Sequence, residues 1–162
     1  MCRGLTTGVA GRIIIVIHVG SSSRRVDRVW AGRYLGYDGA GNVVEFTKGF
    51  LQWCDLTTPL ALPKADWLLF LEVGEHMLHE DEMMLIRNLH AHNTKGLILS
   101  WAGVAQGGNG HVNNHSQEYL IKLFEALGYD FDEGASKGIR AAAFFSWFRQ
   151  TLFIFRRRQD GP

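Results

Sequence analysis

Residues 67–76 read WLLFLEVGEH, and this stretch decides the fold class of the chain. Its first part, Trp67–Val73, is a short apolar run broken only by Glu72 near its end. Runs of this kind are typical of strands buried on both faces, which occur in parallel sheets covered by helices. The stretch therefore predicts a buried strand of a parallel sheet, which Gly-Glu-His follows directly in the sequence.

Similar apolar runs on both sides of this stretch predict further strands. They cover Arg12–Val19, Tyr34–Tyr37, Phe50–Cys54, Leu97–Trp101, Tyr129–Phe131 and Leu152–Phe155. Between them, polar and Gly-rich segments alternate with segments of helical periodicity. Regular alternation of strands and helices predicts an α/β fold with a mostly parallel sheet.

Two helices are clear from spacing and capping. One covers Glu80–His92, and the other follows the N-cap residue Ser116 as far as Leu127, with Gly128 ending it. The remaining segments are expected to be a short helix at Val26–Arg33, a loop at Val43–Gly49, a long loop at Ala105–Asn114, and a turn or short helix at Gly134–Arg140.

The composition fits one globular domain without a nucleic-acid or membrane partner. The 162 residues are 46% hydrophobic and 20% charged, and the formal net charge is +1, so there is no strong nucleic-acid signal. The apolar run Ile13–Ile17 is too short to cross a membrane. The two cysteines, Cys2 and Cys54, form neither a disulfide framework nor a zinc quartet, which favours a reducing, cytoplasmic setting.

The chain is expected to divide into a loose segment at 1–11, a domain at 12–158 and a tail at 159–162. The basic end of that domain, Arg156–Arg158, is predicted to be solvated, and the aromatic run Phe144–Phe148 is predicted to belong to the core. The sequence does not indicate an oligomeric state.

Informative residues follow the predicted strands directly, at the edge where parallel sheets bind ligands. They are Gly20, Asp38, Asp55, Glu72 and Trp101. A carboxylate at such a position can accept hydrogen bonds from a ribose diol, and a neighbouring backbone N–H can recognise an adenine edge. The alternative is that these acids only cap the next helix or turn, and the residues alone leave both interpretations open.

Several short motifs occur in an order that resembles one known family. They are GYDG at 36–39, DLTTPL at 55–60, LEVGEH at 71–76, LSWA at 99–102 and QGGNGHVN at 106–113. Over roughly residues 34–158 the chain resembles class I S-adenosylmethionine-dependent methyltransferases, in a group of methyltransferase-domain proteins whose substrates are mostly unassigned. The resemblance implies a Rossmann-like sheet with helices on both faces, N-terminally short for the family. It also implies S-adenosylmethionine as cofactor and methyl transfer to an acceptor, with a small molecule favoured.

The resemblance also assigns roles to cofactor-binding residues. Asp38 matches the acid that binds the ribose hydroxyls, and Cys54 and Asp55 match the pair that holds the adenine. Glu72 matches the residue near the methionine moiety. The first loop, 19–25, reads VGSSSRR, so Gly20 alone remains of the GxGxG pattern that lets a backbone approach the cofactor closely.

That departure leaves two functions open. The chain is either a methyltransferase with a divergent first loop, or a catalytically silent methyltransferase-like fold that acts as a binding or interaction module. A third explanation is that the N-terminal part does not correspond to the family. Cofactor binding separates an active methyltransferase from a silent fold.

Histidines are the candidate catalytic residues. A methyl acceptor that carries a proton needs a general base, and imidazole titrates in the right range. His76 matches the histidine of the family's acid–histidine pair, and His111 lies on the Gly-rich loop Gln106–Asn113, which we expect to act as a lid on the acceptor side. Each of the two histidines could equally be a structural hydrogen-bonding residue.

Other chemistries find less support in the sequence. His76, His79 and Glu80 lie close together, and His111 and His115 are four residues apart, but HExxH and CxxC motifs are absent, so we expect no metal. The chain has no GxSxG elbow and no P-loop, which argues against a hydrolase and against phosphoryl transfer.

Overall fold

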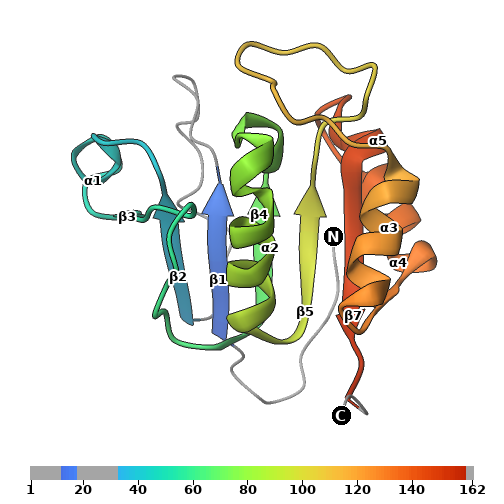
Figure 1. Cartoon of the computed structure of the whole chain (residues 1–162), viewed down its shortest axis with the longest axis horizontal. Coiled ribbons are helices and arrows are strands. Elements are labelled where there is room, and N and C mark those ends of the chain that lie inside the picture. Colours follow the sequence, from blue (N-terminus) through green and yellow to red (C-terminus); the bar gives the residue numbers. More distant parts are fainter. Residues whose placement is uncertain (1–11, 18–32, 160–162) are drawn as a thin grey trace.

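A seven-stranded sheet organises the residues that the computed structural model describes, 12–17 and 33–159 (Figure 1). Its strand order is β3-β2-β1-β4-β5-β7-β6, so the chain begins in the middle of the sheet and builds outward on both sides. The strands are β1 Arg12–Ile17, β2 Arg33–Asp38, β3 Gln52–Trp53, β4 Ala65–Leu71, β5 Asn93–Ser100, β6 Tyr129–Phe131 and β7 Leu152–Arg157.

Strand direction brings five carboxyl ends to one edge of the sheet. β1 pairs in parallel with β2 and β4, β2 with β3, and β4 with β5, whereas β7 runs antiparallel to β5 and β6. In the centre, Ile15 of β1 is opposite Gly36 on one side and Leu69 on the other. The segments that follow β2, β3, β4 and β5 therefore meet at the upper edge in Figure 1.

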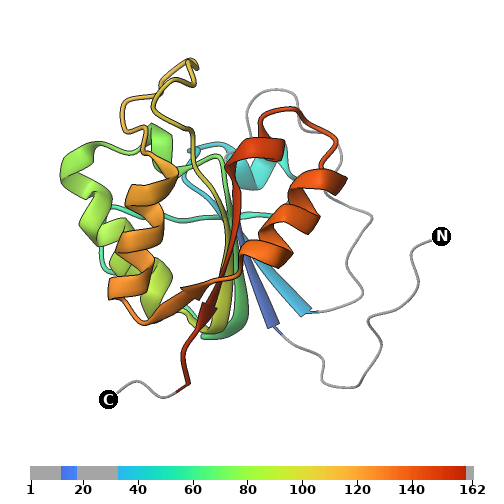
Figure 2. The same ribbon diagram turned by 90° about the vertical axis from the view of Figure 1, so that its right-hand side faces the viewer.

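Helices cover both faces of the sheet, as predicted. Figure 2 shows α2 (Glu82–Ala91) and α3 (Gln117–Ala126) on one face, and α4 (Glu133–Ala142) and α5 (Phe148–Thr151) on the other. Two short 3₁₀ turns, η1 at Gly74–His76 and η2 at His79–Asp81, connect β4 to α2. Among the described residues, no helix is long and apolar enough to cross a membrane.

The core lies between the sheet and helices α2 and α3. Phe70 of β4, Leu97 of β5 and Phe155 of β7 are fully buried, as are Leu85 of α2 and Phe124 of α3. Phe124 and Phe155 pack with ring centroids 4.7 Å apart. Burying one side chain of this size contributes about 1.5–3 kcal/mol, so these contacts fix how the helices lie on the sheet.

Some predicted elements need correction. The segment Val43–Gly49, predicted to be a loop, contains the helix α1 at Val43–Phe46, where Val43 is buried and Thr47 Oγ1 donates to the carbonyl of Val43 at 2.7 Å. The Gly134–Arg140 segment is a full helix, whose first turn is capped by the side chain of Asp132. The helix predicted at Val26–Arg33 lies outside the described residues, except for Arg33, which begins β2.

The aromatic run Phe144–Phe148 was predicted to belong to the core, and for most of its members this is wrong. Phe144 is 87% exposed, and Phe145 and Trp147 stack on one another at 4.7 Å on the surface. These rings lie in or next to the connection between α4 and α5.

The basic segment Arg156–Arg158 is largely solvated, as predicted, but its side chains also contact the rest of the fold. Arg156 and Arg157 belong to β7, and Arg156 Nε contacts Asp132 Oδ2 at 2.6 Å. Arg157 donates to the carbonyls of His90 and Asn93, so it holds the end of α2 against the sheet.

Candidate functional site

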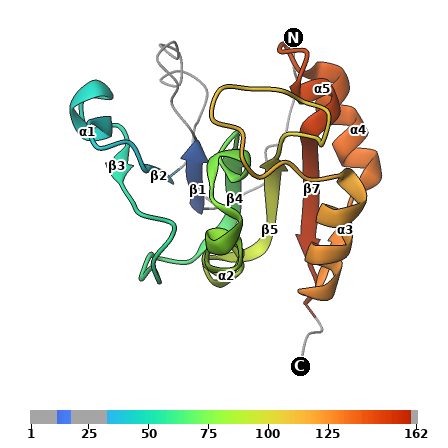
Figure 3. The ribbon, with the colours of Figure 1, turned by 45° about the horizontal axis from the view of Figure 1, so that its top comes forward.

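A cavity of about 360 Å³ lies at the carboxyl edge of the sheet, beyond β2, β3 and β4. Figure 3 tilts this edge toward the viewer, and the loop between β5 and α3 arches over the neighbouring strands. The cavity has the size of a small-molecule site. It is lined by Asp38, Gly39, Ala40, Trp53, Cys54, Asp55, Leu56, Thr57, Val73, His76 and Met77.

Asp38 is the last residue of β2 and forms part of the cavity wall. Only 2% of it is exposed, and its Oδ1 accepts a hydrogen bond from the amide of Ala40 at 2.6 Å. Its backbone carbonyl accepts from the amide of Cys54 at 3.0 Å, which joins the ends of β2 and β3. The chain thus holds a buried carboxylate in a fixed orientation, the kind of group that binds hydroxyl donors strongly.

The turn after β3 supplies a second carboxylate. Asp55 Oδ1 accepts from the amide of Thr57 at 2.9 Å and from Thr57 Oγ1 at 2.7 Å, and these hydrogen bonds lower the pKa of Asp55. Burial raises the pKa of the neighbouring Cys54 thiol, and the charge of Asp55 raises it further by a smaller amount. At neutral pH this part of the cavity therefore presents a charged carboxylate beside a neutral thiol.

Trp53 is a cavity residue that sequence reasoning did not single out. Its side chain is 56% exposed, yet its indole Nε1 donates to the carbonyl of Gly39 at 3.2 Å, which fixes the ring beside the cavity. An exposed aromatic ring at the end of a strand, directly before Cys54, was the available signal. Such a ring offers a flat apolar face to a planar ligand.

A second group of residues gathers around Glu75 in η1. Glu75 is fully buried, and neither of its carboxyl oxygens has a hydrogen-bonding partner among residues 12–17 and 33–159. Burial raises the pKa of Glu75 to about 7, and the charge of Glu72 adds to the rise. The nearby backbone amides of Glu75 and Ala102 act in the opposite direction, although neither makes a hydrogen bond of acceptable geometry to the carboxyl group.

The Gly-rich loop is attached to η1 and carries His111 to it. The amides of Val112 and Asn113 donate to the carbonyl of Glu75 at 2.8 and 3.1 Å. His76 Nδ1 lies 3.1 Å from the carbonyl oxygen of Gly110, and the His76 and His111 rings meet edge to face at 5.0 Å. The two predicted catalytic histidines are therefore neighbours, and the loop contacts the cavity residue His76. Its movement as a lid stays a prediction.

The remaining predicted site residues are placed differently. Glu72 does not line the cavity. Its amide donates to Ser100 Oγ at 2.8 Å, and the Ser100 hydroxyl donates to Glu72 Oε1 at 2.7 Å. These two hydrogen bonds join the ends of β4 and β5. Glu72 also has a φ of +55°, a conformation that non-glycine residues adopt at a cost. Gly20 lies outside the described residues. The structure thus brings together Asp38, Cys54, Asp55 and His76 around the cavity.

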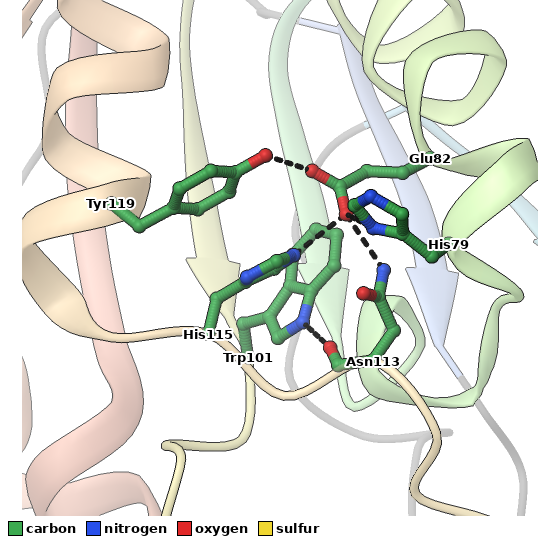
Figure 4. Close-up of polar contacts among 6 residues, drawn as sticks. All are labelled: His79, Glu82, Trp101, Asn113, His115 and Tyr119. Carbon is green, nitrogen blue, oxygen red and sulfur yellow. Dashed lines mark hydrogen bonds and ion pairs between the residues drawn. The ribbon is translucent and has the colours of Figure 1, made fainter.

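Glu82, at the start of α2, organises a polar network that the sequence did not reveal (Figure 4). Its Oε2 accepts from Asn113 Nδ2 at 2.8 Å and from His115 Nε2 at 2.6 Å, and its Oε1 accepts from the hydroxyl of Tyr119. Burial favours a raised pKa for Glu82, but the hydrogen bonds from Tyr119, Asn113 and His115 lower it overall. Burial and the contact with Glu82 raise the pKa of Tyr119 to about 12.

Trp101 connects the Glu82 network to the sheet. Its indole Nε1 donates to the carbonyl of Asn113 at 2.6 Å, and its ring also covers Gly74, where an added Cβ would lie 2.4 Å from the indole. On the other side of Trp101, a cavity of about 510 Å³ separates the β5–α3 loop from α5 and β7. It is lined by Trp101, Gly103, Ala105, Gln106, His115, Gln117, Ser146, Trp147, Gln150, Thr151 and Phe153.

Two trios of side chains in the described part of the chain have the spacing of metal ligands. They are Glu75, His76 and His111, and His79, Glu82 and His115, and the ligand atoms within each trio lie within 4.8 Å of one another.

Comparison with known proteins identifies the fold. No protein-family model matches the chain, and no curated protein matches its sequence. Among solved structures, the chain is similar to magnesium protoporphyrin IX methyltransferase from Synechocystis PCC 6803, with a TM-score of 0.63 and 17% identity over 90% of this chain and 74% of that one. It is also similar to the N-methyltransferase NodS from Bradyrhizobium japonicum WM9, with a TM-score of 0.60 and 14% identity over 93% of this chain and 88% of that one.

A further similar structure is a pericyclic reaction enzyme, with a TM-score of 0.60 and 11% identity over 96% of this chain and 45% of that one. The similarities at these low identities concern the fold. The chain has the fold of class I S-adenosylmethionine-dependent methyltransferases, as the sequence motifs predicted.

Proposed function

We propose that the chain binds S-adenosylmethionine and transfers its methyl group to a small-molecule acceptor. The observation that carries this proposal is the cavity beyond β2, β3 and β4, with the buried carboxylate of Asp38 at its wall. Solved structures with the same fold include methyltransferases crystallised with the cofactor or with its product, S-adenosylhomocysteine. The free, buried thiol of Cys54 supports a reducing, cytoplasmic setting.

The residues around the cavity fit the adenosine part of the cofactor. Asp38 would accept the ribose hydroxyls, since its carboxylate is buried, oriented by the Ala40 amide and bordered by the cavity. Asp55 and the neutral thiol of Cys54 would border the adenine, and the Trp53 ring offers it a flat surface. Gly20 would belong to the same site through the first loop.

The bound cofactor supplies an electrophilic methyl group on a sulfonium, and the chain has to position an acceptor in line with it. His76 borders the cavity, with His111 against its ring, so either imidazole can take a proton from an acceptor that carries one. Glu72, held by Ser100 at the end of β4, would border the methionine part of the site.

A silent binding module is the second candidate function. The specific observation in its favour is the first loop, VGSSSRR at 19–25, which keeps only Gly20 of the GxGxG pattern. The same fold also occurs in a pericyclic reaction enzyme, so the fold is not confined to methyl transfer.

Thermal unfolding with and without S-adenosylhomocysteine tests the proposal. At about one hundred times the dissociation constant, binding adds ~2.7 kcal/mol to stability, a rise in Tm of roughly 5–10 °C for a domain of this size. Asp38→Asn should lose most of that rise. Asp130→Asn, an exposed acid on β6 far from the cavity, should keep it. A wild-type chain that melts cooperatively without any shift would support the silent module instead.

A further inference from the structure

The buried carboxyl group of Glu75 points to a partner from outside the chain. The residue is fully buried in η1, and no donor among the described residues makes a hydrogen bond of acceptable geometry to Oε1 or Oε2. Buried polar groups in folded proteins are almost always paired, so an unpaired carboxyl group requires an explanation such as a bound ion. Its position beside His76, at the cavity wall, puts that partner in the proposed functional site.

The two imidazoles beside Glu75 have the outer hydrogen bonds that metal-binding histidines use. His76 Nδ1 lies 3.1 Å from the Gly110 carbonyl, and His111 Nδ1 lies 3.3 Å from the Gln106 carbonyl. A carbonyl only accepts, so Nδ1 of each ring carries the proton and Nε2 carries the lone pair. A backbone carbonyl on the non-ligating nitrogen is the usual arrangement around a bound metal, because it fixes the tautomer and the ring orientation.

We infer that Glu75, His76 and His111 bind a divalent transition-metal ion, with Zn²⁺ the best match. One ligand atom from each lies within 4.8 Å of the other two, close enough for one ion to contact all three after small side-chain movements. Two imidazoles and one carboxylate suit Zn²⁺ and leave coordination positions open for another molecule. This revises our expectation from the sequence that no metal binds.

The glycines of the loop explain how ligands that are 36 residues apart come together. A Cβ on Gly108 would lie 2.2 Å from His111 Nε2, so this glycine lets the imidazole lie flat against the backbone. Gly110 has a φ of +76°, the left-handed conformation that glycine adopts without strain, and this turn directs its carbonyl to His76. The Gln106–Asn113 loop therefore holds the proposed ion's ligands.

The second trio, His79, Glu82 and His115, does not need an ion. Glu82 already accepts hydrogen bonds from Tyr119, Asn113 and His115, so its carboxylate is satisfied within the chain. The two trios have the same residue types and similar spacing, and only the first contains an unpaired carboxyl group. This difference assigns the metal to Glu75 and makes the second trio a matched control.

The ion also indicates a class of acceptor, and this step rests on the proposed function. A bound divalent cation attracts oxygen ligands and lowers the pKa of a hydroxyl group that it contacts. Acceptors with a hydroxyl group are therefore favoured. In that arrangement His76 and His111 would act as ligands, and the hydroxyl proton would pass to solvent water; the oxygen would then take the methyl group as the bond between methyl carbon and sulfonium sulfur breaks.

Metal titration of the full chain, without cofactor, tests the inference. After dialysis against a chelator, ZnCl₂ is added in a calorimeter, and CoCl₂ is added as a spectroscopic probe of the coordinating atoms. The wild-type chain should bind one equivalent. Glu75→Gln and His111→Asn should each weaken binding at least about tenfold, whereas His79→Asn, which alters an exposed histidine of the second trio, should bind as the wild type does.

Circular dichroism of each variant confirms that it folds, so that lost binding reports the site. Wild-type protein that binds no zinc, or zinc binding that His79→Asn abolishes and Glu75→Gln leaves intact, would overturn the assignment. Titrating the same metal-free samples with S-adenosylhomocysteine separates the two proposals. Product binding without zinc binding rejects only the metal site, and zinc binding without product binding rejects only the cofactor site.

Discussion

Glu75, in the connection from β4 to α2, and Glu82, the first residue of α2, are both buried, but their hydrogen-bonding partners differ. Glu75 is 0% exposed and Glu82 1% exposed, so the two carboxyl groups lose nearly the same hydration. The pKa of Glu75 is raised to about 7, while that of Glu82 is lowered. The difference lies in their partners, because Tyr119, Asn113 and His115 surround Glu82 with donors and nothing comparable reaches Glu75.

With the proposed metal site, this contrast separates a structural acid, Glu82, from a ligand-binding one, Glu75. A buried carboxylate that the chain itself satisfies joins α2, α3 and the β5–α3 loop into one unit. A buried carboxyl group that the chain leaves unpaired destabilises the fold, and is retained where it contacts a ligand. Burial alone would have given both residues the same role.

The largest expected effect comes from replacing each acid with methionine, in metal-free protein. Glu82→Met leaves buried donors on Asn113 and His115 without an acceptor, and should lower the free energy of unfolding by about 3 kcal/mol. Glu75→Met removes an unpaired carboxyl group and should raise it by ~1–2 kcal/mol. Urea denaturation of both variants measures the two values. If both substitutions changed the free energy of unfolding in the same direction, the proposed difference between Glu75 and Glu82 would be wrong.

A smaller effect is expected from Gly74, which directly precedes Glu75 in η1. In Gly74→Ala the new Cβ would lie 2.4 Å from the Trp101 indole, which must move away from its hydrogen bond to Asn113. Crowding of this kind costs about 2 kcal/mol, and the tryptophan emission should shift because the indole is displaced. Gly103→Ala is the control, since a Cβ there meets no atom within 4 Å and should change neither property.

Much of the fold follows from local patterns in the sequence. The apolar run after Asp66 became β4, and Ser116 caps α3 by accepting from the amide of Tyr119, because strand burial and helix capping depend on residues close in the chain. The cavity residues Asp38 and Asp55 could be found for the same reason, since each directly follows a predicted strand, whereas Cys54 was assigned through the family resemblance.

The hydrogen-bonding partners of Glu82 could not be predicted from local sequence patterns. Asn113 and Tyr119 lie 31 and 37 residues from Glu82, and no periodicity connects them. The exposure of Phe144 is a related case, because a run of aromatic residues indicates apolar character and does not specify which element will cover it. Helix α1 has only four residues, too few for a helical period to appear.

A single hydrogen bond of the Glu82 network can be removed with little other change. Tyr119→Phe keeps the ring that stacks on His115 at 4.0 Å and deletes only the hydroxyl that donates to Glu82 Oε1. The expected loss is about 1 kcal/mol in the free energy of unfolding. Removing the exposed ion pair Lys122–Glu118 on the same helix, by Lys122→Met, should lower the free energy of unfolding by less, because solvent screens exposed charges. Equal losses in the two variants would show that burial adds nothing to the Tyr119 contact.

The smallest expected effect is a change in how stability depends on pH. Because the hydrogen bonds hold the pKa of Glu82 below its unfolded value of about 4.3, its charged form stabilises the folded state above that pH. The contribution is fully present above pH ~5 and is lost as the pH falls through the lowered folded pKa. Unfolding free energies of wild type and Glu82→Gln should therefore converge between pH 6 and pH 3. A gap that stays constant over this range would mean that the network binds the neutral carboxyl group equally well. In that case hydrogen-bond partners would not be what distinguishes Glu82 from Glu75.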